Sequence, residues 1–345
     1  MIDPHVHLRD WNEARKETLE HGLDVAYAAG LNAVFEMPNT NPSLISKELI
    51  TERIRLADTT LKKSGLKIFH GLYGGITDNS RQIEEMVDAY NTFFPRVVGF
   101  KLYTSKTADL GITQESQQGT VYETLSKLGY KGVLAVHCEK ESLFHPNLWD
   151  RNFPYTHALA RPPEAETASV RDQIEFADKA GFKGTLHICH ISVPESLDAI
   201  EQARGNVSFK ITCGVTPHHC MLYDRLMDQK NGTLLKINPP LRPESMRKAM
   251  LEALLEGRID WIESDHAPHT LDDKFKDSSS GIPVLPYLPH FIKYLRQNGA
   301  SQKQIDNLSH NNIVRTFGIE IANTHRKPDY NLAEEYPFDP FERLK

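Results

Sequence analysis

Short apolar segments rich in β-branched and aromatic residues alternate along this chain with longer segments of helical periodicity. Alternation of this kind is typical of βαβ units, in which helices connect parallel strands. Eight apolar segments occur, at residues 1–7, 31–37, 67–73, 97–103, 132–138, 184–190, 207–213 and 260–265. Eight strands connected in this way predict an α/β fold of the closed (β/α)8 barrel type rather than an open sheet.

Helical segments fill the intervals between these strands. They lie at residues 12–29, 47–62, 81–92, 121–128, 167–180, 194–203 and 244–255, and two more follow the last strand at 286–298 and 302–317. A length of 345 residues is normal for one barrel, so we expect a single domain over residues 1–323. Residues 324–345 are polar and contain proline, which predicts a tail that packs on the barrel or is partly loose.

Composition and charge exclude several other classes of protein. A net charge of −6 gives no basic excess for binding nucleic acid, and no apolar segment is long enough to cross a membrane. The sequence opens with Met-Ile-Asp-Pro-His, without the basic and apolar regions of a secretion signal, so we expect a cytoplasmic protein. The four cysteines have neither zinc-binding spacing nor disulfide density, which predicts reduced, buried thiols.

Residue types that bind metals stand at the ends of several predicted strands. His5 and His7 are two residues apart on the first strand, so both imidazoles face the same side. The fourth, fifth, sixth and eighth strands end near Lys101, His137, His190 and Asp265. The C-terminal ends of barrel strands converge on one mouth, where active sites lie. Four histidines and an aspartate there have the chemistry of a zinc site, although each alone would be taken for a packing or surface residue.

Lys101 would be an unusual neighbour for metal ions as a cation. Like charges and burial lower the pKa of an amine and favour its neutral form. A neutral lysine can react with carbon dioxide to give a carbamate, whose two oxygens would bridge two metal ions. The alternative is an unmodified Lys101 that pairs with a carboxylate.

With these motifs assembled, residues 1 to about 319 resemble the dihydroorotase family of the amidohydrolase superfamily. The sequences of its motifs are most similar to those of the bacterial type I enzymes and of the dihydroorotase domain of the animal multifunctional pyrimidine enzyme. The motifs are His-Val-His-Leu-Arg (5–9), Met-Pro-Asn-Thr (37–40), Gly-Phe-Lys-Leu-Tyr (99–103), His-Cys-Glu (137–139), Cys-His-Ile-Ser (189–192), Thr-Pro-His-His (216–219), Asn-Pro-Pro-Leu-Arg (238–242) and Ser-Asp-His-Ala-Pro-His-Thr (264–270).

The resemblance implies a metal-dependent hydrolase with two Zn²⁺ ions per subunit. His5, His7 and Asp265 would hold the more buried ion. His137 and His190 would hold the second, with N6-carboxylated Lys101 and a hydroxide bridging the two ions. The implied reaction is the reversible cyclisation of N-carbamoyl-L-aspartate to L-dihydroorotate in pyrimidine biosynthesis. The bridging hydroxide would attack the ring amide carbonyl, and Asp265 would act as general base and then general acid.

The resemblance also implies a grip on the substrate carboxylate by Arg9, Asn39 and His269. A guanidinium suits bidentate carboxylate binding. The alternatives are an ion-pair role for Arg9, a turn role for Asn39 and an ordinary loop position for His269. Residues 104–110 match the family's mobile catalytic loop, in which Thr107 would contact substrate.

The sequence departs from the family's pattern in three places. Type I relatives carry a small β-sandwich built from both termini, whereas this sequence enters the first strand at once, so we expect no developed module of that kind. Gly214 stands where the animal domain has a glutamate, so an extra metal site using that glutamate should be lost. The sequence of the loop at 272–286 differs from the usual glycine-rich sequence of type I enzymes, which leaves its contacts with the substrate undetermined.

Several neighbours of the predicted ligands are expected to be structural. Cys138 and Cys189 flank predicted ligands, so strand alternation predicts that both face outward from the barrel. His187 lies three residues before His190, which predicts that it faces the surrounding helices. The roles of Asn238 and Arg242 stay open between shaping the pocket and capping a loop.

Two other functions are compatible with the same residues. A hydantoinase, dihydropyrimidinase or allantoinase would share the metals, but its neutral ring would give Arg9 no carboxylate to bind. A catalytically inactive, dihydroorotase-like subunit would be expected to lose metal ligands, and here every ligand position is filled. Partners other than a small-molecule substrate stay open, and include a homodimer and an association with aspartate transcarbamoylase.

Overall fold

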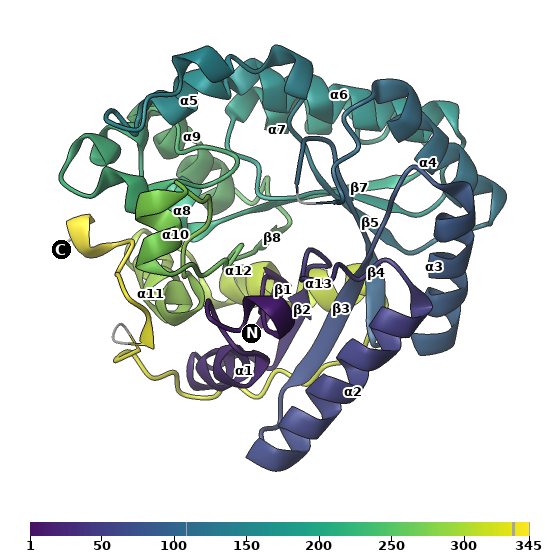
Figure 1. Cartoon of the computed structure of the whole chain (residues 1–345), viewed down its shortest axis with the longest axis horizontal. Coiled ribbons are helices and arrows are strands. Elements are labelled where there is room, and N and C mark those ends of the chain that lie inside the picture. Colours follow the sequence, from purple (N-terminus) through teal and green to yellow (C-terminus); the bar gives the residue numbers. More distant parts are fainter. Residues whose placement is uncertain (108, 333–334, 345) are drawn as a thin grey trace.

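The eight predicted strands are all present, and together they form one parallel sheet in sequential order, β1 to β8. The structure is a computed structural model that describes residues 1–107, 109–332 and 335–344. The strands are β1 (Ile2–Val6), β2 (Ala33–Glu36), β3 (Phe69–Gly75), β4 (Val97–Tyr103), β5 (Val133–His137), β6 (Thr185–Ile188), β7 (Lys210–Val215) and β8 (Trp261–Ile262). The predicted (β/α)8 barrel is therefore confirmed (Figure 1).

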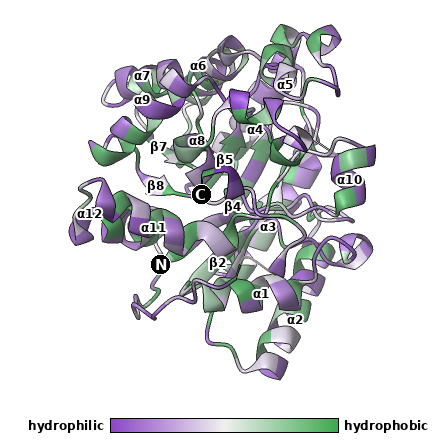
Figure 2. Ribbon diagram, turned by 90° about the vertical axis from the view of Figure 1, so that its left-hand side faces the viewer, coloured by the Kyte–Doolittle hydropathy of each residue, from purple (hydrophilic) through white to green (hydrophobic). Residues whose placement is uncertain are grey.

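Helices cover the outside of the sheet and connect successive strands (Figure 1). The connecting helices are α1 (Leu19–Ala28), α2 (Lys47–Ser64), α3 (Ser80–Phe93), α4 (Glu115–Lys127), α6 (Pro163–Lys179), α7 (Pro194–Ala203) and α9 (Glu244–Leu255). After β8 come α11 (Leu288–Gln297), α12 (Gln302–Asp306), a π-helical turn (Asn307–Asn311) and α13 (Asn312–Phe317). Helices such as α2 and α11 carry both hydrophilic and hydrophobic residues, as expected for helices with one buried face (Figure 2).

The helix predicted over residues 12–29 is wrong at its beginning. The chain forms a short 3-10 turn at Trp11–Glu13, and α1 begins only at Leu19. Positive φ at Arg9, Asp10 and Trp11 makes the chain enter this segment through a turn, and α1 begins where the Thr18 side chain caps it by accepting from the His21 amide. Short helices that the periodicity did not predict lie in the loops at the barrel mouth: α5 (Thr156–Ala160), α8 (Pro217–Met221) and α10 (Leu271–Lys276).

The barrel closes where the chain beyond β8 meets β1. His266 pairs with Val6 as a parallel bridge, and the His7 amide donates a hydrogen bond to the His266 carbonyl at 2.8 Å. Asp265 lies immediately before this bridge. Closure of the barrel therefore brings the predicted base against the end of the first strand.

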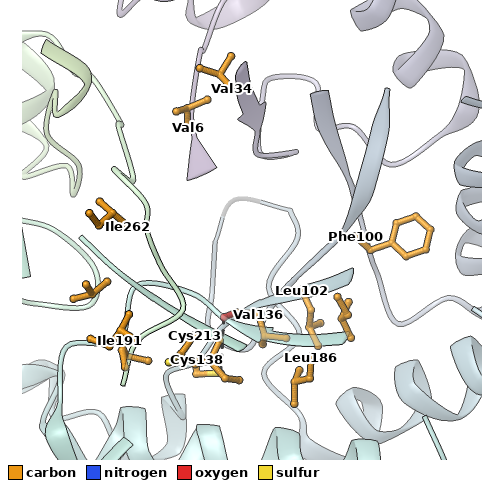
Figure 3. Close-up of a cluster of buried hydrophobic side chains, with 14 of the residues drawn as sticks. Val6, Val34, Phe100, Leu102, Val136, Cys138, Leu186, Ile191, Cys213 and Ile262 are labelled. Atoms are coloured by element: carbon orange, nitrogen blue, oxygen red, sulfur yellow. Dashed lines mark hydrogen bonds between the residues drawn. The ribbon is translucent and has the colours of Figure 1, made fainter. Parts of the chain in front are cut away.

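Two apolar layers lie on the two faces of the sheet. Outward side chains such as Val34, Leu102 and Leu186 are buried between strands and helices (Figure 3). Inward side chains fill the barrel, and the Phe317 ring packs against Phe35 with 5.1 Å between centroids. Burial of both faces explains why the strand segments read as continuous apolar runs.

A polar layer lies between the inner apolar core and the mouth, and it corrects two expectations. Cys189 faces inward, where its sulfur accepts a hydrogen bond from the Lys101 amine at 3.0 Å. His187 also faces inward, 3.0 Å from a Glu263 carboxylate oxygen, and stacks on Trp261. The predictions of an outward Cys189 and a helix-facing His187 are therefore wrong. The φ of His190 is +35°, and this kink ends the strand alternation that the predictions assumed.

Cys138 lies in the outer apolar cluster, as predicted. The tail predicted for residues 324–345 includes residues 333–334 and 345, which lie outside the described residues. In its described part, the Tyr336 hydroxyl donates to Glu17 at 2.5 Å and Phe341 is buried. The division of the chain at residue 323 stays a prediction. Within the described residues, no helix combines the length and hydropathy needed to cross a membrane.

Gly214 offers a test of how tightly the polar layer is packed. A Cβ at Gly214 would lie 2.5 Å from the Glu263 carboxylate, so we expect Gly214→Ala to lower the free energy of unfolding by about 1–3 kcal/mol. Urea unfolding would measure this change.

The matched control is Gly119→Ala on α4, where the new Cβ would meet its nearest neighbour at 3.8 Å. This substitution should stabilise the protein by roughly 0.5–1 kcal/mol, because alanine favours a helix. Equal effects at the two glycines would contradict a tightly packed layer around Glu263.

Candidate active site

One cavity of about 230 Å³ opens at the C-terminal ends of the strands. Nine of the ten predicted site residues line it: His5, His7, Arg9, Asn39, Thr107, His137, His190, Asp265 and His269. The tenth, Lys101, is fully buried below it. Six lining residues were not predicted as site residues: Glu13, Tyr103, Asn238, Ala267, Ser280 and Gly281.

Two histidines from β1 meet Asp265 on one side of the cavity. Oδ1 of Asp265 lies 3.3 Å from Nε2 of His5 and 2.9 Å from Nε2 of His7. The β1–β2 register shifts between Asp3 and Val6, so His5 and His7 reach the mouth from an irregular strand. Asp265 also has a positive φ, of 49°, which turns its side chain toward them.

His137 and His190 form a second pair beside the first. Nδ1 of His137 lies 3.2 Å from Nε2 of His190. The rings of His5 and His190 are 5.1 Å apart between centroids, so the two groups adjoin. Ligand atoms of His5, His190 and Asp265 all lie within 4.8 Å of one another.

In each of the two histidine groups, one histidine has a hydrogen-bond acceptor at the ring nitrogen that does not face the other ligands, which we call its outer ring nitrogen. Nδ1 of His7 lies 2.6 Å from Oδ1 of Asn39, and Nε2 of His137 lies 2.8 Å from a Glu139 carboxylate oxygen. An oxygen acceptor at these positions places the ring proton on that nitrogen. The opposite nitrogens then present lone pairs to the cavity.

In the first group, this arrangement leaves a lone pair facing an anionic oxygen, because Nε2 of His7 faces a carboxylate oxygen of Asp265. Facing acceptors at such distances repel unless a proton or a metal ion lies between them. In the second pair, Nε2 of His190 can carry the ring proton and donate it to Nδ1 of His137, since Nδ1 of His190 has no hydrogen-bond partner among the described residues.

Burial lowers the pKa of His7 to about 4 and that of His190 well below its usual value, so neither ring carries a second proton at neutral pH. Burial also opposes a charge on His5, but Cys189 and Glu263 raise the pKa of His5 to about 9. Imidazoles and a carboxylate are the ligand types that fit a divalent transition metal ion, which would displace such a proton.

Arg9 and His269 line the same cavity and contact each other. An Arg9 guanidinium nitrogen lies 3.2 Å from Nε2 of His269, and Nε of Arg9 donates to the Pro268 carbonyl at 3.3 Å. Arg9 is 7% exposed, so its charge is largely removed from water. A desolvated guanidinium beside an imidazole is suited to bind an anionic group.

A strained turn presents Arg9 to the cavity. Asp10 stabilises it by accepting hydrogen bonds from the backbone amides of Trp11 and Leu19, each at 2.6 Å. Arg53 of α2 donates to the Arg9 carbonyl at 3.0 Å and lies over the Trp11 ring. Positive φ at non-glycine residues is costly and concentrates at functional sites, which agrees with a binding role for this turn.

The loop after α10 completes the wall near His269. The Ser280 carbonyl lies 3.0 Å from Nε2 of His269. Lys274, which is fully buried, fixes this loop by donating to the carbonyls of Lys236, Ser279 and Gly281 at 2.8–3.0 Å. The sequence gives no signal for these contacts, because they depend on backbone atoms positioned by one distant lysine.

Thr107 reaches the cavity from the segment after β4. Its hydroxyl donates to the Ser105 carbonyl at 3.3 Å. The predicted mobile loop at 104–110 includes Ala108, which lies outside the described residues, so its mobility stays a prediction.

Comparison with known proteins places this site in a family, although no protein-family model matches the chain. A dihydroorotase of Halobacterium salinarum is 31% identical over 327 residues, covering 93% of this chain and 72% of that protein. A dihydroorotase of Thermococcus kodakarensis is 31% identical over 339 residues, covering 98% of this chain and 71% of that protein. This chain belongs to the dihydroorotase family.

Solved structures agree on the fold of this family member. An L-hydantoinase from Arthrobacter aurescens superimposes with a TM-score of 0.79 at 21% identity, covering 92% of this chain and 70% of that one. A D-hydantoinase from Thermus sp. gives a TM-score of 0.72 at 21% identity, covering 92% and 70%. At this identity the likeness establishes the barrel alone. Dihydroorotases and hydantoinases are metal-dependent amidohydrolases, which agrees with the candidate ligands at the mouth.

The support of Arg9 in this dihydroorotase fold should depend on pH. Glu36 pairs with Arg53 and lies 2.9 Å from Nε2 of His70. Burial alone would raise the pKa of Glu36, but Arg53 and His70 lower it from its ordinary value of 4.5 to about 2. A carboxylate with a lowered pKa contributes stability above pH 4.5 and loses that contribution as the pH falls through 2.

We therefore expect the urea midpoint of metal-free protein to fall between pH 4.5 and 2. Glu36→Gln should be less stable at neutral pH, because Arg53 then has no buried counter-charge, and its midpoint should fall less steeply with acid. Urea unfolding at several pH values would measure both effects. Equal slopes for the two proteins would contradict a lowered pKa at Glu36.

Proposed function

We propose that this chain catalyses the reversible interconversion of L-dihydroorotate and N-carbamoyl-L-aspartate. The observation that supports this most directly is the position of Arg9 and His269 in the same cavity as the histidine and aspartate groups. The substrate carries a carboxylate beside a cyclic amide. A cationic wall and a candidate metal centre in one cavity match those two features.

The same wall argues against a hydantoinase, dihydropyrimidinase or allantoinase activity. Their rings are neutral, so the largely buried Arg9 would gain no anion from the substrate and would keep only Glu13, at 3.8 Å, as a counter-charge among the described residues. The structural likeness to hydantoinases does not favour their substrates, because it extends only to the fold. The identity with dihydroorotases, 31% over most of the chain, favours dihydroorotate.

The cofactor we propose is a pair of Zn²⁺ ions. His5, His7 and Asp265 would hold one ion, and His137 and His190 would hold the other. Lys101 would bridge them as a carbamate, since it is fully buried and its amine lies 5.0 Å from the ring centroid of Tyr103, which lines the cavity. Bound ions would supply Lewis-acid polarisation of the ring carbonyl and would lower the pKa of a water molecule.

The chain's own residues would bind the substrate and move the proton. Arg9, His269 and the Asn39 side-chain amide would bind the carboxylate and fix the ring's orientation. Asp265 would accept a proton from the attacking water and deliver it to the leaving amide nitrogen. Its position suits this role, because Oδ1 of Asp265 lies 3.3 Å from Nε2 of His5 and 2.9 Å from Nε2 of His7, beside the proposed ion.

Further parts of the proposal concern the subtype and the surroundings of the site. The sequences of the motifs support a type I enzyme whose barrel spans residues 1–323. Thr107 would contact substrate from a loop that closes over the cavity. A homodimer and an association with aspartate transcarbamoylase are compatible with this function, and both would be tested by the mass of the purified protein alone and in mixture.

Turnover measurements on zinc-loaded protein test the function. We expect conversion in both directions and a fall in kcat of about 10²–10⁴-fold for Asp265→Ala as a lost general base. Asp178→Ala, at an exposed position of α6, should change kcat little. Arg9→Met should lower kcat/KM by about 10–100-fold, chiefly through KM, because it removes a charged hydrogen-bond donor.

Other outcomes would favour the alternatives. Two bound metals without turnover of dihydroorotate would direct the search to hydantoin and allantoin. Absence of both metal and turnover would favour an inactive, dihydroorotase-like subunit.

The carbamate at Lys101 can be tested separately. Native mass spectrometry of metal-loaded protein should show the added mass of one carbon dioxide, and Lys101→Met should lack it. Metal loading in carbon dioxide-free buffer should leave activity low until bicarbonate is added. Full activity of Lys101→Met would contradict a bridging role for the residue.

A further inference from the structure

A buried carboxylate stands behind the second histidine pair. Glu139 follows His137 by two residues and accepts a hydrogen bond from its Nε2 at 2.8 Å. Thr104 fixes the backbone here, because its hydroxyl accepts from the Glu139 amide at 3.0 Å and donates to the His137 carbonyl at 2.8 Å. Glu139 is fully buried and does not line the cavity. Its side chain can therefore act on the site only through His137.

Arg161 keeps this carboxylate ionised. Its Nε donates to one oxygen of Glu139 at 3.0 Å and its Nη2 to the other at 2.5 Å. The guanidinium also lies over the Phe144 ring, 4.3 Å from the centroid. A two-point pair of this kind fixes the carboxylate in orientation as well as in charge.

Arg242, whose role the sequence left open, connects this pair with the segment after His190. Its Nη1 donates to the Arg161 carbonyl at 2.6 Å, and its Nε donates to the Ser192 hydroxyl at 3.0 Å. Ser192 follows His190 by two residues. One buried guanidinium thus joins the segment between β5 and α6, which holds Arg161, to the segment just after His190.

A second carboxylate balances the charge of Arg242. Glu166 lies 3.7 Å from Nη2 of Arg242 and accepts hydrogen bonds from the backbone amides of Ser192 and Val193 at 3.0 and 3.2 Å. Two arginines and two glutamates therefore compensate one another in the interior. Loss of any one would leave an uncompensated buried charge, so the group behaves as a unit.

We propose that Glu139, Arg161 and Arg242 are positioning residues for the ion held by His137 and His190. Glu139 keeps the ring proton of His137 on Nε2, which leaves Nδ1 free to bind the ion. Arg242 holds together the two segments that it joins and so fixes the separation of the two histidines. This inference rests on the proposed function in one respect, because it takes this pair to bind a metal ion.

A cobalt titration tests this network directly. Metal-free protein would be titrated with Co²⁺ while its absorption spectrum and a competing chelator report each binding step. We expect two steps in the wild type. Glu139→Gln should weaken one step by about 10–100-fold and leave the other unchanged, because removing a partner of a ligating histidine has effects of this size.

Two arginine variants extend the test. Arg242→Met and the milder Arg242→Lys should weaken the same step, with the lysine variant nearer to the wild type. The matched control is Arg204→Met, since Arg204 also joins backbone carbonyls of separate segments, those of Ile211 and Arg258, but lies away from the cavity. The control should titrate like the wild type even if it unfolds at lower urea.

The outcomes separate this inference from the proposed function. Folded Glu139→Gln and Arg242→Lys with wild-type affinity at both steps would overturn the network, even if the wild type turns over dihydroorotate. Equal weakening by Arg204→Met would also overturn it, because the effect would then be general. Two cobalt steps and the expected weakening, without turnover of dihydroorotate, would sustain the network and reject the substrate.

Discussion

The contact between His7 and Asp265 at the barrel mouth sets the requirement that the rest of this structure meets. Nε2 of His7, whose ring proton is held on Nδ1 by Asn39, lies 2.9 Å from Oδ1 of Asp265. Two acceptors stay so close only when the fold holds them there. Barrel closure between Val6 and His266 supplies that constraint on one side. On the other side, acceptors on the outer ring nitrogens prevent the rings from turning over.

Two buried arginine–glutamate pairs support the cavity in a similar way. Arg53 and Glu36 support the backbone of Arg9, and Arg161 with Glu139 supports His137. Both arginines act on the site from outside the cavity, through a backbone carbonyl or a ligand's ring. A site that is rigid before substrate binds loses less entropy on binding, which is the physical advantage of such supports.

The sequence was sufficient to predict the strands and most of the cavity. Apolar segments of the right length and spacing predicted all eight strands, and the order of metal-binding residue types on them predicted where His5, His137 and Asp265 meet. Alternation held between His187 and Cys189, which both lie inside the barrel, and it failed at His190, where a positive φ lets this next residue reach the cavity as well. The sequence also did not predict that Ser280 and Gly281 line the cavity, or which residues Arg242 contacts. These contacts depend on backbone atoms and on segments far apart in the chain.

Gly214 shows why a residue's identity can mislead when its neighbours in space are unknown. The glutamate of animal-type domains is missing at this position, which by itself suggests a barrel layer short of one carboxylate. The structure places Glu263 of the adjacent strand there, 2.5 Å from where a Cβ of residue 214 would lie. Its oxygens accept from the His190 amide and the Trp261 indole and pair with His187. The layer therefore keeps a buried negative charge. This charge requires glycine at position 214, because any larger side chain would displace the Glu263 carboxylate, which accepts a hydrogen bond from the backbone amide of His190.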